Sequence, residues 1–534
     1  MKTRDASHGA LPSVAALLAL AFGAVPYAAC STPPAAEGPA VPAIASKTAE
    51  VLAAARRAAG WDALRTSGGA VRVTGAARFL GTDATRVALF DAAGRYIESF
   101  DGPLSQSSGS DGAVTWARDW SGTPRILVLG DRTQGELERL FVTGAWTLGD
   151  GALSFDDEAR REGDELVLSF RHPDGILSGS IRLDARTHRA RSAVYATDTT
   201  PTTWTFEGWT EHHGIAYPAR IAYETEGRAQ SFTTRTVERL ARAEPGAFAP
   251  RLERPRDTRF DASLSAALEV QTVRTGHVLV HPLVNGKDLG WFIFDTGAGT
   301  NCISNEVTAE LGTEPFGEIA ARGVGGTVAA RFWRAGELRL GPVTVEAPVF
   351  MGLDLAFLEP HFGVRVGGIL GYELLARCVA EVDMQAGAIA LHDPERYRLP
   401  ADAGWEELLL YGRHPCVRAG FEGHAGVFRV DTGAAGDTVT FHYQVVADLG
   451  LADGRETRGG HAGGVGGFVG TKVGSLASFR LGGRDLGAIE ASFALEDQGA
   501  FADDYTAGNI GGKLLEPFRL VFDYPGGRVA FLPR

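Results

Sequence analysis

Two copies of the tetrapeptide Asp-Thr-Gly-Ala carry the chemistry that this sequence could perform. The first begins at Asp295 and the second at Asp431, 136 residues later, and each directly follows a short apolar run. Two carboxyl groups held side by side cannot both ionise, so such a pair retains one proton. One member could act as a base on water while the other acts as an acid, a combination that can hydrolyse an amide. The titration would belong to the pair, so the sequence does not say which aspartate holds the proton.

The residues around each aspartate repeat as well, which indicates an internal duplication. A His-Pro dipeptide opens an apolar strand in both copies, at His281 and His414, and a turn containing glycine then leads to the strand before the aspartate. Downstream, a Gly-x-x-Gly-x-x-Leu-Leu element begins at Gly368 and again at Gly508, 140 residues later. A near-constant offset over this length is the signature of duplication. We therefore expect two related lobes, residues 273–400 and 401–534.

With these motifs, the C-terminal half resembles the aspartic proteases, specifically the retropepsin-like branch found in retroviruses and in many exported bacterial proteins. The resemblance implies a mainly β, two-lobed acid-protease fold, with both lobes in one chain and related by a pseudo-twofold axis. It implies Asp295 and Asp431 as the catalytic pair, with no metal and no organic cofactor. The implied substrate is a peptide or protein bound in an extended conformation.

The resemblance also implies supporting roles for residues near the two aspartates. The hydroxyls of Thr296 and Thr432 can bond across the lobe interface, and Gly297 and Gly433 leave room for the opposing loop. An apolar-apolar-glycine element would support each loop. Two glycine-rich hairpins would close over the substrate. The alternative for each hairpin is an ordinary flexible turn. The loop-supporting residues are Ile369, Leu370, Gly371, Ile510 and Gly511, with Asn509 departing from the usual aliphatic; the hairpin residues are Val324, Gly325, Gly326, Gly464, Val465 and Gly466, within 322–327 and 459–467.

Other repeated polar residues have simpler interpretations. His281 and His414 each precede a proline at the start of a strand and are expected to be structural. Asp383 and Asp523 flank hairpins and are expected at turns or on the surface rather than in a second acid pair. No Gly-x-Ser-x-Gly or His-Glu-x-x-His motif is present, so serine-hydrolase and zinc-protease chemistry lack their usual signatures.

The first residues read as an export signal. Residues 1–30 combine a short basic start with an apolar middle and small residues at the end. A membrane-spanning helix is the weaker alternative, because the apolar stretch is short and contains two prolines. The segment ends at Cys30 in a sequence that resembles a lipoprotein lipidation box, except that Tyr27 replaces the usual Leu. We expect an exported protein, periplasmic or membrane-anchored in a bacterial cell envelope, with residues 31–45 as a flexible tether.

Residues 46–243 are expected to form a separate β-rich domain with antiparallel strands. Apolar positions at 51, 52 and 55 and the glycine at 60 predict a helix over 48–59, and period-two alternations predict strands at 125–129, 166–170 and 178–183. With Gly60-Trp61 and the Trp-containing stretch 111–122, this region resembles periplasmic lipoprotein carriers. That resemblance implies a concave apolar face for an acyl chain or peptide; the alternative is a β-domain that positions the protease or its substrate.

Overall composition, net charge and cysteine spacing limit the classes of protein and partner that remain possible. The 534 residues are 44% hydrophobic and 22% charged, as in a soluble multidomain protein. A net charge of -13 with no basic run disfavours a nucleic-acid partner. Of the four cysteines, Cys302, Cys378 and Cys416 lack metal-ligand spacing, and they are expected to be buried thiols, with one disulfide as the alternative. Residues 244–272, rich in Pro, Arg and Glu at 244–257, are expected to be a linker.

The sequence thus predicts an aspartic endopeptidase that hydrolyses peptide bonds with water activated by the aspartate pair. Two alternatives remain open. One is a peptide-binding module that has kept the fold and lost hydrolysis. The other is a lipid or lipoprotein carrier that acts through the N-terminal domain.

Overall fold

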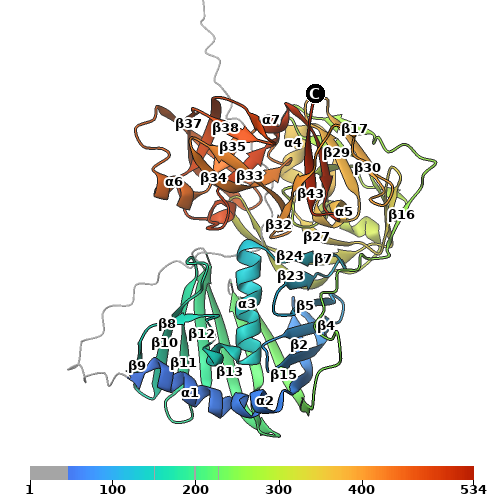
Figure 1. Ribbon diagram of the computed structural model, residues 1–534. Coiled ribbons are helices and arrows are strands. Elements are labelled where there is room, and N and C mark those ends of the chain that lie inside the picture. Colours follow the sequence, from blue (N-terminus) through green and yellow to red (C-terminus); the bar gives the residue numbers. More distant parts are fainter. Residues whose placement is uncertain (1–45, 150, 198–199, 226–227) are drawn as a thin grey trace, which may run out of the picture.

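The computed structural model describes residues 46–534, except 150, 198–199 and 226–227. The predicted export signal, the tether and Cys30 lie outside the described residues. The fold is mainly β, as expected, with an N-terminal domain below a two-lobed C-terminal half (Figure 1). Within the described residues, no helix is both long enough and apolar enough to cross a membrane.

The N-terminal domain is one strongly curved antiparallel sheet wrapped around a helix. Its strand order is β1-β9-β10-β11-β12-β13-β14-β15-β2-β3-β4-β5-β6-β7, with β8 paired to β10. The strands are β1 (Ser46–Lys47), β2 (Ala70–Phe79), β3 (Thr82–Asp91), β4 (Tyr96–Asp101), β5 (Gln106–Ser110), β6 (Thr115–Arg118), β7 (Pro124–Ile126), β8 (Ser154–Phe155), β9 (Glu158–Glu162), β10 (Glu165–Arg171), β11 (Ser178–Asp184), β12 (Ala190–Thr197), β13 (Thr200–His212), β14 (Ile215–Thr225) and β15 (Arg228–Leu240). The helices are α1 (Thr48–Ala59), α2 (Trp61–Ser67) and α3 (Leu129–Thr143), followed by the short 3₁₀ helix η1 (Ala145–Leu148).

Local sequence signals predicted one helix and three strands of this domain, and one of the strands is partly wrong. The helix expected over 48–59 is α1, which ends at Gly60 in a left-handed conformation with φ 80°. The expected strands at 166–170 and 178–183 are β10 and β11. The strand expected at 125–129 is wrong beyond Ile126, because Leu129 adopts φ 51° and begins α3. The apolar residues of α3 recur at helical spacing and are needed to fill the curved sheet.

Helix α3 occupies the concave face that the carrier resemblance implied for a ligand. Leu137, Leu140 and Phe141 of this helix are buried in one core with aromatic residues of the sheet, including Trp204 and Phe170. An apolar cavity of about 30 Å³ remains beside the end of α3, and a more polar cavity of about 200 Å³ remains between α3 and strands β4, β5 and β6. The domain's own helix therefore covers the apolar part of the concave face and leaves a polar cavity at one side.

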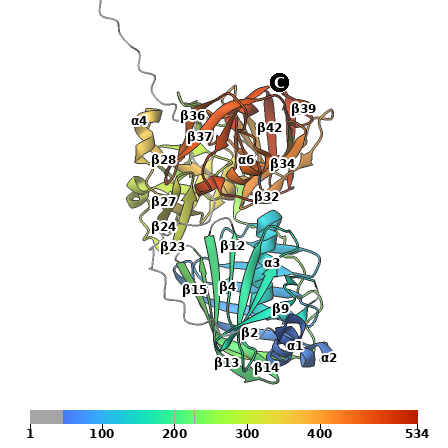
Figure 2. The same cartoon turned by 90° about the vertical axis from the view of Figure 1, so that its left-hand side faces the viewer.

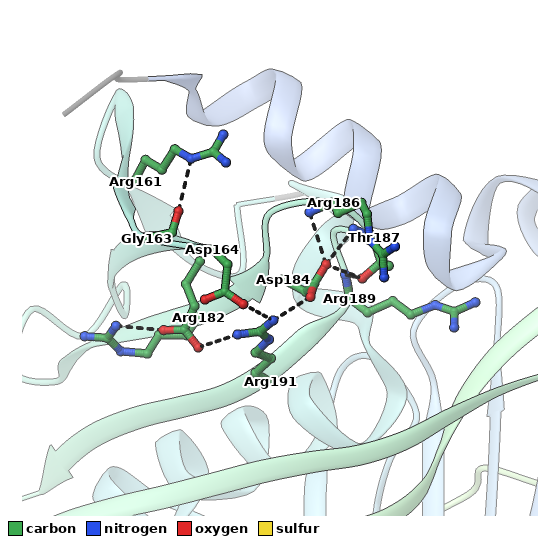
Figure 3. Close-up of polar contacts among 10 residues, drawn as sticks. Arg161, Gly163, Asp164, Arg182, Asp184, Arg186, Thr187, Arg189 and Arg191 are labelled. Carbon is green, nitrogen blue, oxygen red and sulfur yellow. Dashed lines mark hydrogen bonds and ion pairs between the residues drawn. The ribbon is translucent and has the colours of Figure 1, made fainter. Parts of the chain in front are cut away.

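Arginine–carboxylate pairs order the turns at one edge of this sheet (Figure 3). Arg191 contacts Asp184 at 2.5 Å and Asp164 at 2.7 Å, and Asp184 also accepts a bond from the backbone N–H of Thr187 at 2.8 Å. The participating side chains are in contact with solvent, which screens each pair, so the pairs stabilise the turns only weakly. This network fixes the β9–β10 and β11–β12 turns within the N-terminal domain.

The C-terminal half consists of two lobes joined by a shared sheet. The first lobe holds the sheets β17-β18-β21-β28-β22-β27-β24-β23 and β16-β26-β25-β19-β20, and the second holds β36-β37-β40-β35-β41-β34-β33-β38-β39, with β32 paired to β33. The five-stranded sheet β30-β29-β42-β43-β31 combines a hairpin of the first lobe with strands of the second. The duplicated hairpins noted in the sequence therefore meet in this one sheet.

The elements of the first lobe are β16 (Thr258–Phe260), β17 (Val270–Thr272), β18 (Val278–Val280), β19 (Leu283–Val284), β20 (Lys287–Asp288), β21 (Trp291–Phe294), β22 (Cys302–Ser304), η2 (Asn305–Leu311), β23 (Phe316–Gly323), β24 (Gly326–Arg334), β25 (Glu337–Leu340), β26 (Val343–Glu346), β27 (Val349–Leu353), η3 (Ala356–Leu358), α4 (Glu359–Phe362), β28 (Val366–Leu370), α5 (Tyr372–Leu375), β29 (Val379–Asp383) and β30 (Ala388–His392). Those of the second are β31 (Glu406–Glu407), β32 (Leu409–Tyr411), β33 (His414–Phe421), β34 (His424–Asp431), β35 (Val439–Phe441), α6 (Tyr443–Leu449), β36 (Thr457–Gly464), β37 (Gly467–Leu476), β38 (Phe479–Leu481), β39 (Arg484–Asp485), β40 (Ile489–Ala494), η4 (Gly499–Phe501), β41 (Gly508–Gly511), α7 (Gly512–Leu515), β42 (Phe518–Asp523) and β43 (Arg528–Pro533).

The segment expected to be a linker is shorter than 244–272. Strand β16 pairs with β26 and strand β17 pairs with β18, so 258–272 belongs partly to the first lobe. The side chains of Phe260 and Val270 pack against the protease core, which gives these strands a reason to form. Only the stretch up to Asp257 runs between the domains without regular structure.

The N-terminal domain contacts both lobes through its loops and the start of α3 (Figure 2). On the first lobe, Glu318 donates its backbone N–H to the carbonyl of Leu80 at 2.9 Å. On the second lobe, Gly412 donates its N–H to Oδ2 of Asp131 at 2.9 Å, and the Tyr505 hydroxyl bonds Asp174 at 2.8 Å. The three parts are thus held by polar contacts as well as by packing.

Candidate active site

The two Asp-Thr-Gly loops follow equivalent strands of the two lobes. Asp295 comes directly after β21, and Asp431 ends β34. Each strand has a parallel neighbour: β28 beside β21 and β41 beside β34. The backbone N–H of Asp295 donates to the carbonyl of Leu370 at 3.0 Å, and Asp431 pairs in register with Gly511. The five residues expected to support the loops therefore lie behind them; they are Ile369, Leu370, Gly371, Ile510 and Gly511, all buried.

A reciprocal set of hydrogen bonds between two threonines joins the loops. The Thr296 hydroxyl donates to the carbonyl of Val430 at 2.7 Å and accepts from the backbone N–H of Thr432 at 3.0 Å. The Thr432 hydroxyl donates to the carbonyl of Phe294 at 3.0 Å and accepts from the N–H of Thr296 at 3.0 Å. All four bonds are buried and cross the lobe interface, so they fix the two loops against each other.

The glycine of each loop faces the carboxyl group of the other. A side chain at Gly433 would meet the Asp295 carboxyl at 2.5 Å, and one at Gly297 would overlap the Asp431 carboxyl. The Gly297 N–H donates to Oδ1 of Asp295 at 2.7 Å, and the Ala434 N–H donates to Oδ1 of Asp431 at 3.0 Å. The glycines thus permit the close approach of the two carboxyl groups.

Burial and mutual proximity set the protonation of the pair. Asp295 is 0% exposed and Asp431 is 2% exposed. Burial raises the pKa of Asp295 well above its ordinary value, and the facing Asp431 raises it further. Burial raises the pKa of Asp431 as well, with Asp437 adding to the shift. Two interacting carboxyls with raised pKa values can retain a shared proton and offer one acid and one base.

The polar residue Asn509 in the second supporting element has a local partner. Its side chain lies 3.1 Å from Nε2 of His442, whose Nδ1 is 3.0 Å from the carbonyl of Thr506. Burial lowers the pKa of His442 to about 4, so the ring is neutral near neutral pH. The departure from the usual aliphatic is therefore compensated by a buried polar network.

The two glycine-rich hairpins of the lobes meet at their tips. The turn at Val324 and Gly325 joins β23 to β24, and the turn at Val465 and Gly466 joins β36 to β37. Gly325 donates its N–H to the carbonyl of Val465 at 3.1 Å. A side chain at Gly325 would overlap the backbone of Gly467. The two tips are therefore in direct backbone contact.

Sequence reasoning missed His277, which positions the second loop from the first lobe. This buried residue lies with Nε2 2.8 Å from the carbonyl of Gly433 and Nδ1 2.8 Å from the hydroxyl of Thr275. Burial lowers its pKa to about 4, and a neutral ring satisfies both contacts by donating at Nε2 and accepting at Nδ1. Its sequence signal was absent because the residue does not repeat: Arg413 stands 136 positions later.

The other repeated residues lie away from the carboxyl pair. His281 contacts Asp288 at 2.8 Å and stacks on Trp291, while His414 is buried at the start of β33. Asp383 and Asp523 accept backbone bonds within their hairpin turns at 2.8 Å and 2.9 Å, as expected.

The three cysteines that the structure describes form no disulfide. The thiols Cys302, Cys378 and Cys416 are buried and free, which confirms the first of the two readings of the cysteines. Among the residues that the structure describes, no group of three or more His, Cys, Asp or Glu side chains is arranged to hold a metal ion.

Two duplicated lobes, a shared sheet and an aspartate pair at their junction define an aspartyl-protease type of fold and site. In agreement, residues 280–374 match the family model described as aspartyl protease. The match spans Asp295-Thr296-Gly297 and the supporting Ile369-Leu370-Gly371, and it leaves the second lobe and the N-terminal domain uncovered. No curated protein matches the chain.

Three solved structures are similar to parts of this chain. A LolA superfamily protein from Nitrosomonas europaea is 16% identical, with a TM-score of 0.28, over 38% of this chain and 98% of its own. A DUF1329 family protein from Desulfovibrio piger is 12% identical, with a TM-score of 0.28, over 37% and 96%. Basic 7S globulin from soybean is 12% identical, with a TM-score of 0.31, over 50% and 94%. At these TM-scores, no function is drawn from any of them.

Proposed function

We propose that this protein is an aspartic endopeptidase whose dyad is Asp295 and Asp431. The observation that carries the proposal is the buried carboxyl pair, held by the reciprocal bonds of Thr296 and Thr432. A site in which two carboxyls face each other, each held by a backbone N–H, suits hydrolysis of an amide by activated water.

In the proposed reaction, the ionised aspartate takes a proton from a water molecule, whose oxygen attacks the amide carbon. The protonated aspartate donates its proton to the carbonyl oxygen, giving a neutral tetrahedral diol. The aspartate that took the water's proton then delivers it to the leaving nitrogen, while the other recovers its proton from a diol hydroxyl as the carbon–nitrogen bond breaks. The carboxyl pair thus returns to its singly protonated state, and one water is consumed per bond.

The hairpins around Val324 and Val465 are proposed to admit the peptide by opening and then to exclude water by closing. Glycine at the tips supports this role, because the contact between Gly325 and Gly467 has no space for side chains. An extended peptide would then be held by backbone bonds to the flap strands β23 and β36.

The test is cleavage of a mixed peptide library from acidic to neutral pH. Wild type, Asp295→Asn and Asp431→Asn should be compared, since asparagine keeps the shape of the side chain and removes its acid–base function. Cuts that disappear in both variants support the shared dyad. Failure of folded wild type to cut at any pH would instead support a peptide-binding module without hydrolysis.

A carrier function through the N-terminal domain has less support, because α3 packs its apolar residues against the concave face and the larger cavity beside it, about 200 Å³, is lined by charged residues such as Arg118, Asp119 and Glu138. We propose a positioning role for this domain, given its contacts with both lobes. Residues 1–30 support export to a bacterial cell envelope, with a membrane tether if Cys30 is lipidated. The mass of the N-terminal peptide of protein isolated from membranes would test lipidation.

A further inference from the structure

The segment that follows the first aspartate is anchored by Glu373, a side chain of α5. The Glu373 carboxylate accepts a hydrogen bond from the Thr300 hydroxyl at 2.5 Å and another from the backbone N–H of Asn301. The side-chain oxygen of Asn301 accepts in turn from the backbone N–H of Gly371 at 2.9 Å. All of these groups are buried, so the stretch 295–301 is tied to the turn of α5 rather than to solvent.

A single guanidinium joins this turn to the N-terminal domain. Arg377, two residues beyond α5, donates to the backbone carbonyl of Glu373 at 2.6 Å and to the backbone carbonyl of Ser121 at 2.6 Å. It also pairs with Asp257 at 2.6 Å, and only 4% of its side chain is exposed. Ser121 belongs to the turn 119–123, which connects β6 and β7 of the N-terminal domain. The turn of α5 is therefore held from the N-terminal domain.

The connecting turn also lies against both lobes. The ring of Trp120 contacts Phe332 of the first lobe edge to face, with 5.4 Å between the centroids, and Arg413 of the second lobe lies 4.0 Å over the same ring. The Arg413 guanidinium also faces the carboxylates of Asp119 and Glu373. The N-terminal domain and both lobes therefore meet around Glu373.

This anchor does not repeat in the second lobe. At the offset of 140 residues that relates the two Gly-x-x-Gly elements, Glu373 corresponds to Lys513 and Arg377 corresponds to Pro517. A lysine cannot accept the two bonds that Glu373 accepts, and a proline has no group that donates as Arg377 does. The anchor therefore belongs to the lobe that carries Asp295.

We propose that Glu373 is a positioning residue for the Asp295 loop and that the N-terminal domain keeps it in place through Arg377. The N-terminal domain thereby sets how well the two aspartates are aligned, and with it the turnover of the candidate peptidase. Misplacing a reacting group by about 1 Å can cost about a hundredfold in rate. This inference rests on the proposed peptidase function and adds to it the part of the molecule that keeps the site aligned.

The first test is peptide cleavage by full-length variants of Glu373. Glu373→Leu leaves two buried donors without an acceptor. Glu373→Gln keeps one oxygen for the N–H of Asn301 and offers an N–H to the Thr300 hydroxyl. We expect kcat of the leucine variant to fall about tenfold or more with KM nearly unchanged, and kcat of the glutamine variant to stay close to wild type. A change in KM alone, or equal losses in both variants, would overturn the positioning role.

The second test asks whether Arg377 acts through Glu373. Asp257 has 27% of its side chain exposed, so Arg377→Gln leaves no fully buried charge behind. We expect kcat to fall in Arg377→Gln, and the double variant Arg377→Gln/Glu373→Leu to be no slower than Glu373→Leu alone. Losses that add would show that Arg377 acts elsewhere and would refute the proposed route. Arg396→Gln is the matched control, since 73% of that side chain is exposed on the same lobe.

The third test perturbs the N-terminal domain alone. Gly122 lies in the turn 119–123 with φ 77°, so Gly122→Ala strains this turn. The new side chain would contact only Pro255, at 3.5 Å, and neither lobe. Gly163→Ala is the control, because Gly163 has φ 63° in another turn of the same domain and open space around it. We expect kcat to fall severalfold in Gly122→Ala and to stay at the wild-type value in Gly163→Ala. Equal kcat in the two variants would overturn the role of the N-terminal domain.

Hydrogen exchange separates failure of this inference from failure of the proposed function. Peptides covering 298–304 should exchange faster in Glu373→Leu and Gly122→Ala, whereas the equivalent peptides covering 434–440 should keep nearly wild-type rates. If wild type cleaves no peptide, the proposed function falls, and exchange at 298–304 still decides whether the anchor holds the loop. If wild type cleaves peptides but exchange is unchanged in both variants, the inference falls and the peptidase proposal stands.

Discussion

Removing the Thr432 hydroxyl should loosen both aspartate loops at once. In Thr432→Val, the hydroxyl is replaced by a methyl group of similar size. The backbone N–H of Thr296 then loses its acceptor and the carbonyl of Phe294 loses its donor. Both groups are buried between the lobes, so the variant cannot readily replace these bonds with bonds to water.

The magnitude follows from the number of groups left unsatisfied. Each buried donor or acceptor without a partner costs about 1–3 kcal/mol, so the two together cost roughly 2–6 kcal/mol. In the local opening equilibrium that corresponds to roughly 30-fold to 10⁴-fold, since about 1.4 kcal/mol is a factor of ten. The matched control Thr432→Ser keeps the hydroxyl and loses one methyl group, at a cost of about 1 kcal/mol.

Hydrogen exchange of peptides covering 291–299 and 427–435 is the suitable assay, because it reports local opening without requiring two-state unfolding of a multidomain chain. We expect fast exchange in both peptides for the valine variant and near wild-type exchange for the serine variant. Equal effects of the two variants, or an effect confined to one loop, would refute the reasoning, because the bonds are reciprocal across the interface.

Three further outcomes are expected. Burial holds the pKa of His277 and His442 at about 4, whereas the unfolded chain takes up these protons near pH 6.5. Stability contributed by the neutral rings is therefore lost as pH falls from about 6.5 to 4. The denaturant midpoint should decrease between pH 7 and pH 4.5, and the decrease should be smaller in the double variant His277→Gln/His442→Gln than in wild type. Gly325→Ala should force the flap tips apart, because its side chain would overlap Gly467, and it should slow peptide cleavage and speed proteolysis of the hairpins. The control is Gly459→Ala, because the new side chain would enter open space. Equal behaviour of the two variants would contradict the contact between the tips. Solvent extraction and mass spectrometry of purified protein should recover no stoichiometric acyl chain, and a recovered one would show that α3 can leave the concave face.

Local patterns predicted the parts of the site that repeat. The two Asp-Thr-Gly-Ala loops, the Gly-x-x-Gly elements and the glycine-rich hairpins each occur twice, and repetition distinguishes a functional motif from an ordinary turn. Helix α1 was predictable because its apolar spacing and its terminal Gly60 agree. Helix α3 was not, because its beginning at Leu129 overlaps an apolar run that reads as a strand.

Site residues that do not repeat in the second lobe could not be identified from the sequence. His277 reaches the Gly433 carbonyl across 156 positions of chain, and a polar cavity lined by Arg125, Arg322 and Arg429 gathers residues from all three parts of the molecule. Strands β16 and β17 lie in a stretch whose composition is that of a linker, yet they pair with strands of the first lobe. These features depend on partners that are distant in sequence.

The sequence by itself determined the two-lobed β plan and the two candidate aspartates, because a duplicated motif and strand periodicity are properties of neighbouring residues. Only the tertiary structure decided that the hairpin tips touch and that α3 packs on the concave face of the N-terminal sheet. Contact, cavity volume and burial depend on how separate segments pack. Burial in turn sets the charge of Asp295, Asp431 and His277, so their protonation is a property of the fold.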